Sequence, residues 1–262
     1  MEPLRVVMAG TGNAATVLGR MIIRAGHSIV AVAGRDAGKT EALASEWTAR
    51  AVGRFDFRGI GADLCILAVS DQALSGCDAW LRTGDLVTVH TAGSVPMDAL
   101  KSVSERRGVL YPLQSLNSNA TVLPETPILI DGSTEEVASF LFGFAGTLSS
   151  QILRADDAQR ADYHLAAVVG SNFTNHLLAL AEDYCRSKDV LFPILRPLIA
   201  ETVARAFRDS PSRVQTGPAA RNDLGTVQRH LDMLRDMPEL RSVYLAMTRS
   251  ILDRYGNEEG AV

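Results

Sequence analysis

Residues 4–15 read LRVVMAGTGNAA, and this stretch decides the fold. Residues 4–9 form an apolar, β-branched run long enough for one buried strand, and residues 16–25 continue as a helical stretch. Between them lies Gly-x-Gly-x-x-Ala, in which the first glycine permits a tight turn and the second lets a pyrophosphate approach the backbone. Free amides at a helix start favour such an anion. We expect this turn to bind a dinucleotide, rather than to serve another use, through Gly10, Thr11, Gly12, Asn13 and Ala14.

Composition excludes several classes of function. The chain has 262 residues, enough for one large domain or two ordinary ones, and 47% of them are hydrophobic. A net charge of only −4 gives no electrostatic case for nucleic acid binding. No apolar run is as long as a membrane span, and the predicted first strand leaves no room for a signal peptide. Three cysteines form no C-x-x-C pair and are expected to be reduced thiols. We expect a soluble cytoplasmic protein that binds a small molecule and no metal.

The residues after the second predicted strand, residues 28–33, indicate which dinucleotide binds. An NAD site usually places an acidic residue there, which would repel a 2′-phosphate, but this chain has Gly34 followed by Arg35. A guanidinium can grip a phosphate through charge-assisted hydrogen bonds, and Lys39 can assist it. Asp36 is expected to cap the next helix. The pattern favours NADP (NADPH) over NAD; the alternative is that Arg35 is a solvated loop residue.

Further apolar runs complete a doubly wound, parallel, Rossmann-like sheet in an α/β domain over residues 1–154. These predicted strands are residues 63–69, 85–90, 108–111, 127–130 and 148–153. Ligands of such sheets bind beyond the carboxyl ends of the strands. We therefore expect further cofactor contacts from residues at strand ends, namely Val69, Ser70, Thr91 and Gly93.

Other polar residues near the strand ends allow more than one interpretation. Asp71 is expected to cap a helix that runs through Trp80, rather than to act in catalysis. His90 and Ser94 belong to the turn HTAGS and are candidates to line the site; for Ser94, a turn or capping role is the alternative. Gln114, in the segment YPLQS, is expected with Ser94 to contact substrate.

After about residue 156 the strand signal ends and helical periodicity replaces it. Helices are predicted over residues 160–188, 196–208, 224–234 and from Pro238 to a C-cap at Gly256. The sequence therefore predicts an all-α C-terminal domain over residues 155–262. An exposed apolar helix face in that domain would favour a homodimer.

The first of these helices carries an unusual polar face. By helical spacing, His164, Ser171, Asn172 and Asn175 lie on the same side as Val168. Each buried polar group costs about 1–3 kcal/mol unless it finds a partner, and a substrate carboxylate or carbonyl could be that partner. The alternative is that these side chains bond to neighbouring helices.

A second polar segment, QTGPAARND at residues 215–223, breaks the chain at Gly-Pro. Arg221 could bind a substrate carboxylate through two hydrogen bonds, or it could form an ion pair with Asp223 or another helix. Asn222 or Asp223 is expected to cap the helix that follows.

Together these stretches resemble a known family, in which a Rossmann-like N-terminal domain precedes a DUF2520 domain. The similarity covers nearly the whole chain and rests on GTGNAA (10–15), HTAGS (90–94), YPLQS (111–115), HLAAVVGSNFTNHL (164–177), PLIAET (197–202) and QTGPAARND (215–223). The family is similar to 6-phosphogluconate dehydrogenase, ketopantoate reductase, pyrroline-5-carboxylate reductase and the F420-dependent NADP oxidoreductases. The resemblance implies an NADP-binding domain and an α-helical domain that often forms dimers.

The chain departs from ketopantoate reductases at one point. Those enzymes carry Lys and Asn one helical turn apart; if Asn172 matches that Asn, Val168 stands in place of the Lys. His164, one turn further back, is the nearest titratable replacement, and imidazole suits proton donation near neutral pH. We expect an NADP-dependent oxidoreductase that transfers a hydride between NADPH and a small 2-oxo acid or imine, in a ketopantoate reductase-like manner. His164 would give the proton and Asn172 would orient the carbonyl, with substrate contacts from Ser171, Asn175 and Arg221.

Two other functions stay open at this point. A non-catalytic NADP-binding regulator or scaffold would bind the cofactor without turnover. An S-adenosylmethionine methyltransferase also uses a glycine turn after its first strand, but it normally has a carboxylate after the second strand, where this chain has Gly34 and Arg35.

Overall fold

The computed structural model describes residues 2–256. Within that part of the chain, backbone contacts define two compact units that meet between Phe173 and Thr174. The predicted domain boundary at residue 154 coincides with the end of the last strand, and it stays a prediction.

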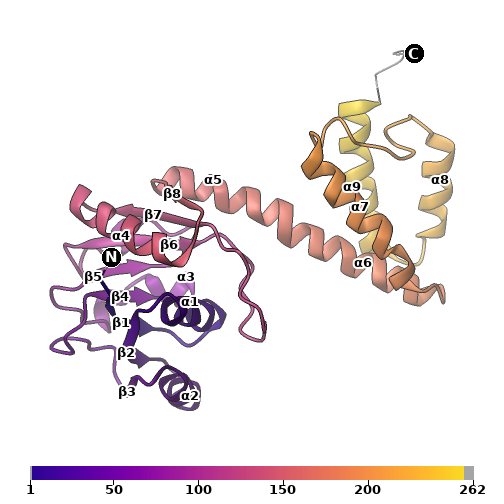
Figure 1. Ribbon diagram of the computed structural model, residues 1–262. Helices are drawn as coiled ribbons and strands as arrows, with labels where there is room; N and C mark the ends of the chain where they lie inside the picture. Colours follow the sequence, from indigo (N-terminus) through magenta and orange to yellow (C-terminus); the bar gives the residue numbers. More distant parts are fainter. Residues whose placement is uncertain (1, 257–262) are drawn as a thin grey trace. The chain divides into compact units, whose positions relative to one another are not determined.

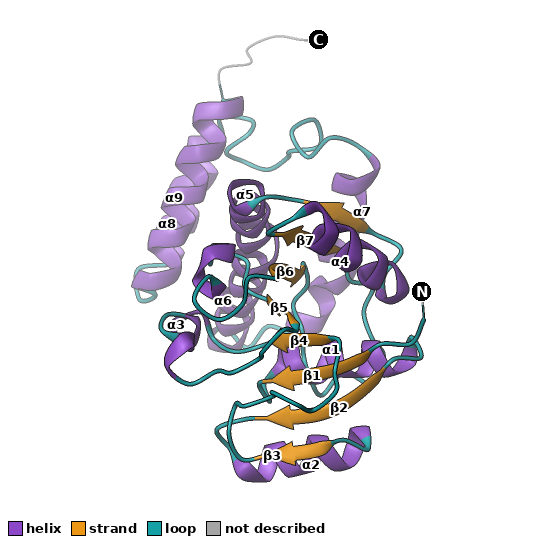
Figure 2. Ribbon diagram, turned by 90° about the vertical axis from the view of Figure 1, so that its left-hand side faces the viewer, coloured by secondary structure: helices purple, strands orange, loops and turns teal. Residues whose placement is uncertain are grey.

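The first unit is built on one sheet, which has eight strands within the described residues, in the order β3-β2-β1-β4-β5-β6-β7-β8 (Figure 1). The strands are β1 (Arg5–Ala9), β2 (Ser28–Ala33), β3 (Arg50–Val52), β4 (Leu64–Leu67), β5 (Val87–His90), β6 (Arg107–Pro112), β7 (Ile128–Gly132) and β8 (Ile152–Arg154). Figure 2 shows β3, β2, β1 and β4 side by side. The α/β Rossmann-like class is confirmed; the short edge strand β3 was not predicted.

One pair of strands corrects the expectation of a parallel sheet. β7 pairs with β6 in antiparallel register, with Leu110 opposite Ile130, whereas β8 is again parallel to β7. A parallel pair needs a crossover connection, usually a helix. No helix lies between β6 and β7 in this described part of the chain, so the chain folds back across the sheet edge and runs in the opposite direction.

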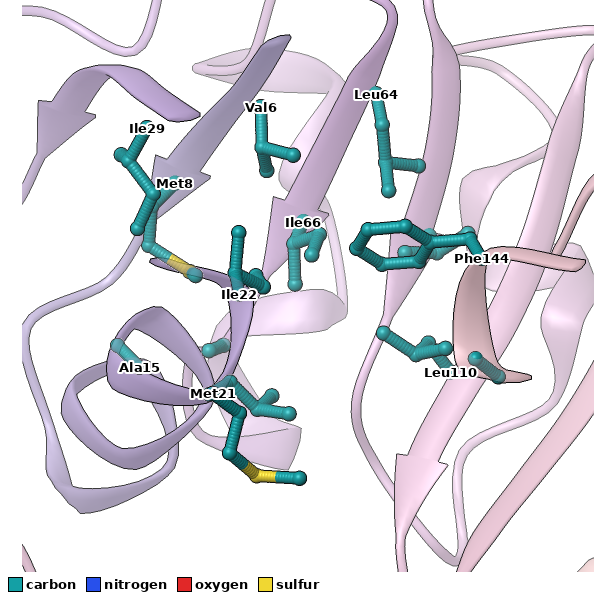
Figure 3. Close-up of a cluster of buried hydrophobic side chains, with 14 of the residues drawn as sticks. Val6, Met8, Ala15, Met21, Ile22, Ile29, Leu64, Ile66, Leu110 and Phe144 are labelled. Carbon is teal, nitrogen blue, oxygen red and sulfur yellow. The ribbon is translucent and has the colours of Figure 1, made fainter. Parts of the chain in front are cut away.

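Each face of the sheet is covered by a separate core. The helices of the unit are α1 (Asn13–Arg24), α2 (Ala37–Trp47), α3 (Asp71–Leu74), α4 (Glu135–Leu148) and α5 (Asp157–Ala167). Val6 and Met8 of β1 face α1, α2 and α4, as Figure 3 shows for part of this cluster. Val7 and Ala9 face the other way, onto α3 and short 3₁₀ segments. This alternation is what a strand buried on both sides requires.

The helix starts show which sequence signals hold locally. Asp36 caps α2 as predicted, because its Oδ1 accepts the Lys39 amide at 3.0 Å. The predicted cap at Asp71 is wrong: Ser70 is the N-cap of α3, and that helix ends at Leu74 rather than continuing through Trp80. α1 begins at Asn13, inside the glycine motif, and its N-cap Gly12 supplies no side-chain cap.

α5 runs directly into a π-helical segment, Val168–Phe173, which closes the first unit. A π turn is wider than an α turn and is frequent at functional sites. The described part of the second unit is helical, as predicted, and contains α6 (Thr174–Ser187), α7 (Arg196–Arg208), α8 (Leu224–Met233) and α9 (Pro238–Tyr255). Asp223 caps α8 through the Thr226 amide. Among the described residues, no helix is long and apolar enough to cross a membrane.

Candidate functional site

The glycine turn opens onto a cavity of about 880 Å³, here called the turn cavity. It lies at the carboxyl ends of β1, β2 and β4, where the predicted cofactor residues converge. Its lining comprises Gly10, Thr11, Gly12, Gly34, Arg35, Asp36, Lys39, Phe55, Ala68, Val69, Ser70, Ala73 and Trp80. The uncapped amides of α1 and two exposed cations, Arg35 and Lys39, therefore border one space, which fits a ligand with several phosphates.

Two glycines of this cavity are required by close approach. Gly10 has φ +128°, and a side chain there would also meet the Ala68 carbonyl oxygen. A Cβ at Gly34 would lie 2.5 Å from Thr11 Cγ2 and 2.7 Å from Thr40 Oγ1. Position 34 therefore has no room for the acidic side chain that an NAD site would place there.

Phe55 and Trp80 form an aromatic pair that was not identified from the sequence. Their ring centroids are 4.7 Å apart with an interplanar angle of 65°, and both line the turn cavity beside Arg35. Each ring gives the cavity an apolar aromatic wall, against which a planar ring can pack. The two residues lie in different loops, so no periodic pattern could have linked them.

A second cavity of about 450 Å³, here called the imidazole cavity, adjoins the first, because Val69 lines both. It brings together turns after β4, β5 and β6 with α5 and the π segment. Its lining comprises Asn13, Ala14, Val69, Asp71, Thr91, Ala92, Gly93, Tyr111, Pro112, Leu113, Gln114, Ser115, Leu116, His164, Ala167, Val168, Ser171 and Asn172. Four members of the predicted polar helix face thus reach the same space as the predicted strand-end residues.

His164 is held by a tyrosine from β6. Tyr111 Oη lies 2.9 Å from His164 Nδ1, and the two rings meet edge to face. Gly93 provides the room, because a Cβ there would lie 2.6 Å from Nδ1 and 2.9 Å from Tyr111 Cζ. Burial, with the nearby Asp71 carboxylate, raises the pKa of Tyr111, so the phenol keeps its proton near neutral pH. Tyr111 belongs to the segment YPLQS, and no pattern in the sequence assigned it a role.

Asp71 and Ser94 form a second pair at this cavity. The Ser94 hydroxyl donates to Asp71 Oδ2 at 2.7 Å, and the Asp71 side chain is among the lining residues. Ser94, a predicted substrate contact, thus holds a wall residue in place. The Asp71 side chain is exposed and does not cap a helix. Only the tertiary structure reveals this placement.

His90 lies behind the cavity wall rather than on it. It is fully buried, and its Nδ1 accepts the Ala92 amide at 3.2 Å, so it shapes the turn that carries Gly93. Burial, with the nearby Arg160 charge, lowers the pKa of His90 to about 4. The expectation that His90 lines the site is wrong, because the last residue of β5 points into the core.

The remaining predicted residues divide between the units. Gln114 lines the imidazole cavity, but its amide is engaged locally: Nε2 donates to the Glu125 carbonyl and Oε1 accepts the Ser115 amide. Asn175 and Arg221 lie in the second unit, in α6 and in the loop before α8. Their part in substrate binding stays a prediction. Among the described residues, no group of histidine, cysteine and carboxylate side chains could hold a metal ion.

Comparisons with known proteins agree with this architecture. A family model described as a domain of unknown function, DUF2520, matches residues 126–251. The structure is similar to that of a Bacteroides fragilis protein provisionally classed as an NADP oxidoreductase, with 36% identity, 96% of this chain and 99% of that chain covered, and a TM-score of 0.86.

More distant structures share the fold. A Thermotoga maritima protein has 18% identity and a TM-score of 0.71, covering 97% of this chain and 99% of its own. A reductive aminase of Aspergillus terreus, crystallised with NADPH and ethyl-5-oxohexanoate, has 17% identity and a TM-score of 0.70, covering 98% and 96%. No curated protein matches the sequence. The chain therefore belongs to the DUF2520 family, as a member in which a Rossmann-like sheet precedes the helices, and it shares a family with the B. fragilis protein.

Proposed function

We propose that the chain is an NADP-dependent oxidoreductase that transfers a hydride between NADPH and a small 2-oxo acid or imine. One observation carries the proposal: two adjoining cavities share Val69 and extend from Arg35 to His164. A dinucleotide needs such an elongated site, with cations at the 2′-phosphate end and polar groups at the other. The relative from B. fragilis, classed with the NADP oxidoreductases, supports the same activity.

The residues of the turn cavity fit this cofactor. The amides at the start of α1 would bind the pyrophosphate, and Arg35 with Lys39 would bind the 2′-phosphate. Val69 and Thr91 would contact the nicotinamide end, where Val69 joins the two cavities. When bound, the cofactor supplies or accepts the hydride at its nicotinamide ring.

His164 is the proposed proton donor. To give a proton, His164 would act as the imidazolium cation: its Nδ1–H would donate to Tyr111 Oη, which lies 2.9 Å away, and its Nε2–H would be left for the substrate. A carbonyl oxygen or imine nitrogen within reach of Nε2 would accept this proton as the adjacent carbon receives the hydride. Tyr111 acts here as a positioning residue, and Gly93 allows the arrangement.

Asn172 is proposed to orient the reacting carbonyl through its amide, since it lines the same cavity as His164. Ser171 would contact the rest of the substrate from the neighbouring position of the π segment. Ser94 and Gln114 would act on the substrate by positioning residues of the cavity wall: Ser94 donates to Asp71, and Gln114 Oε1 accepts the Ser115 amide. Asn175 and Arg221 are proposed as further contacts, with Arg221 on a substrate carboxylate.

The experiment is a matched pair of histidine substitutions, screened for NADPH oxidation with 2-oxo acids and cyclic imines. His230 of the second unit makes the same type of contact as His164: its Nδ1 lies 2.9 Å from Tyr244 Oη. His164→Gln should lower kcat by about 10²–10⁴-fold and leave NADPH affinity unchanged, whereas His230→Gln should leave both unchanged.

Three outcomes separate the hypotheses. Undiminished turnover in His164→Gln would exclude His164 as the proton donor. NADPH binding by thermal shift, without turnover of any carbonyl or imine, would favour a regulator or scaffold. Stabilisation by S-adenosylmethionine but not by NADPH would overturn the cofactor assignment.

We also propose that the chain forms a homodimer through its helical unit. α7 and the segment before it expose large apolar side chains, which include Leu191, Ile194, Leu198 and Phe207, the last with 86% of its surface exposed. Apolar groups gathered on a surface favour association. Light scattering should give the dimer mass, and Phe207→Glu should shift it toward the monomer. A native chain that is monomeric at micromolar concentration would contradict this proposal.

A further inference from the structure

We infer that the imidazole cavity selects a substrate whose reacting carbon–nitrogen double bond is positively charged, an iminium cation, over a 2-oxo acid, and that Asp71 is the residue responsible. This inference rests on the proposed function and narrows its substrate class. It depends on which charges surround the place where the substrate would react.

The lining of the cavity carries charge of one sign. Among the described residues that border it, Asp71 is the only carboxylate, and there is no lysine or arginine. The other polar groups are amides, hydroxyls and the His164 imidazole. A substrate carboxylate in the imidazole cavity would therefore meet a like charge and, among the described lining residues, no lysine or arginine.

The nearest buried cation does not cancel Asp71. Arg160 is only 1% exposed, and its Nη2 donates to Asp157 Oδ1 at 2.7 Å and to the Val95 carbonyl oxygen. Its charge is thus largely compensated by Asp157 and it does not border the cavity. The pKa of Tyr111, on the same cavity wall as His164, shows which charge has the larger effect. Burial is the main cause of its rise; of the two charges, Asp71 raises this pKa more than Arg160 lowers it.

One hydrogen bond orients the exposed Asp71 carboxylate. Oδ2 accepts the Ser94 hydroxyl at 2.7 Å, which ties α3 to the turn after β5. Among residues 2–256, no hydrogen bond engages Oδ1, so one carboxylate oxygen is left for a ligand. A carboxylate at the rim of a cavity, with one oxygen hydrogen-bonded and the other open, is suited to bind a cation through a charge-assisted interaction.

Chemistry agrees with this placement. When an iminium ion is reduced, its carbon gains the hydride, the C=N π pair becomes the nitrogen lone pair, and NADPH, the reductant, becomes NADP⁺. This hydride transfer needs no proton from the protein, so the loss expected for His164→Gln applies to carbonyls and neutral imines and not to a permanent iminium ion. The positive charge passes from the substrate to the nicotinamide ring. A nearby carboxylate would therefore gather the cation into the site, whereas it would repel the anion of a 2-oxo acid.

The test is Asp71→Asn, which removes the charge and retains an oxygen that can accept the Ser94 hydroxyl. Glu105→Gln is the matched control, because Glu105 is exposed and does not border either cavity, and the change in net charge is the same. The substrates are 1-methyl-1-pyrrolinium, a permanent iminium cation, and 2-oxobutyrate. Binding of pyrrolidinium and of cyclopentanecarboxylate to the NADP⁺-saturated chain is measured by calorimetry in parallel.

We expect Asp71→Asn to lower kcat/KM for 1-methyl-1-pyrrolinium, and the affinity for pyrrolidinium, by about tenfold or more, which corresponds to about 1.4 kcal/mol. It should leave 2-oxobutyrate and cyclopentanecarboxylate unchanged or improved, and Glu105→Gln should change none of these values. If the native chain prefers 2-oxobutyrate and Asp71→Asn does not affect pyrrolidinium binding, the substrate class is overturned while the oxidoreductase stands. If neither substrate is reduced, the binding data alone decide. Equal affinity for pyrrolidinium in the native chain and in Asp71→Asn then overturns the role of Asp71.

Discussion

Gly93→Ala tests whether the position of His164 matters for activity. The added methyl carbon would lie 2.6 Å from His164 Nδ1, about 0.8 Å short of the 3.4 Å at which ordinary contact begins. It would also lie 2.9 Å from Tyr111 Cζ, so the methyl group would be wedged between two rings that are hydrogen-bonded to each other. The imidazole must therefore move by a large part of an ångström.

A displacement of about 1 Å at a reacting group can cost on the order of 10²-fold in rate. We expect kcat to fall by about 10- to 100-fold, and the free energy of unfolding to fall by about 1–3 kcal/mol, as for other overpacked sites. NADPH affinity should change much less, because most of the proposed cofactor contacts lie at the turn cavity.

The assay measures NADPH oxidation at saturating cofactor, together with thermal melting. Gly53→Ala is the control, because a Cβ at Gly53 meets nothing within 4 Å and its φ needs no glycine. The reasoning is refuted if Gly93→Ala keeps kcat within about twofold of the native value while melting as the control does.

Three further predictions concern the cofactor, the proton donor and acid stability. Arg35→Ser should weaken NADPH binding by about 10- to 100-fold and leave NADH binding nearly unchanged, because hydrogen bonds to charged groups contribute about 1.5–3 kcal/mol. Fluorescence titrations measure both affinities, and equal losses for the two cofactors would contradict the 2′-phosphate role of Arg35. Tyr111→Phe should lower kcat and alter its pH profile with KM for NADPH unchanged, whereas Tyr244→Phe should alter neither. The pKa of His90 is lowered from 6.5 to about 4 in the folded chain, so between these pH values the unfolded chain binds more protons than the folded one. The free energy of unfolding should therefore fall as the pH drops from 6.5 to 4, by about 3 kcal/mol from this group. Urea unfolding across that range should show the loss, and His90→Gln should reduce it; an unchanged slope would exclude His90 as its source.

Local signals in the sequence were sufficient for most elements. The apolar run of β1, the glycine turn and the helical stretch after it are consecutive, so their identity needed no tertiary information. The cap at Asp36 and the start of α9 at Pro238 follow from local hydrogen bonding and from the fixed φ of proline. The antiparallel β7 did not follow, because strand direction depends on how a long loop returns to the sheet.

The candidate site divides in the same way. Helical spacing placed His164 and Asn172 on one face, and the structure brings both to the imidazole cavity. The same spacing could not show that Tyr111 would reach His164, or that Asp71 would face Ser94 instead of capping a helix. Those contacts join segments more than 20 residues apart, and their sequence separation carries no periodic signal.

By itself, then, the order of residues in this chain determined a nucleotide-type turn, an α/β sheet and a helical continuation, because each depends on neighbours within one or two turns of the backbone. Only the tertiary structure decided which strand ends meet, that Gly93 makes room for two rings, and that one carboxylate among the described residues borders the imidazole cavity. The physical reason is that packing and electrostatics act through space, between side chains that the fold alone brings together.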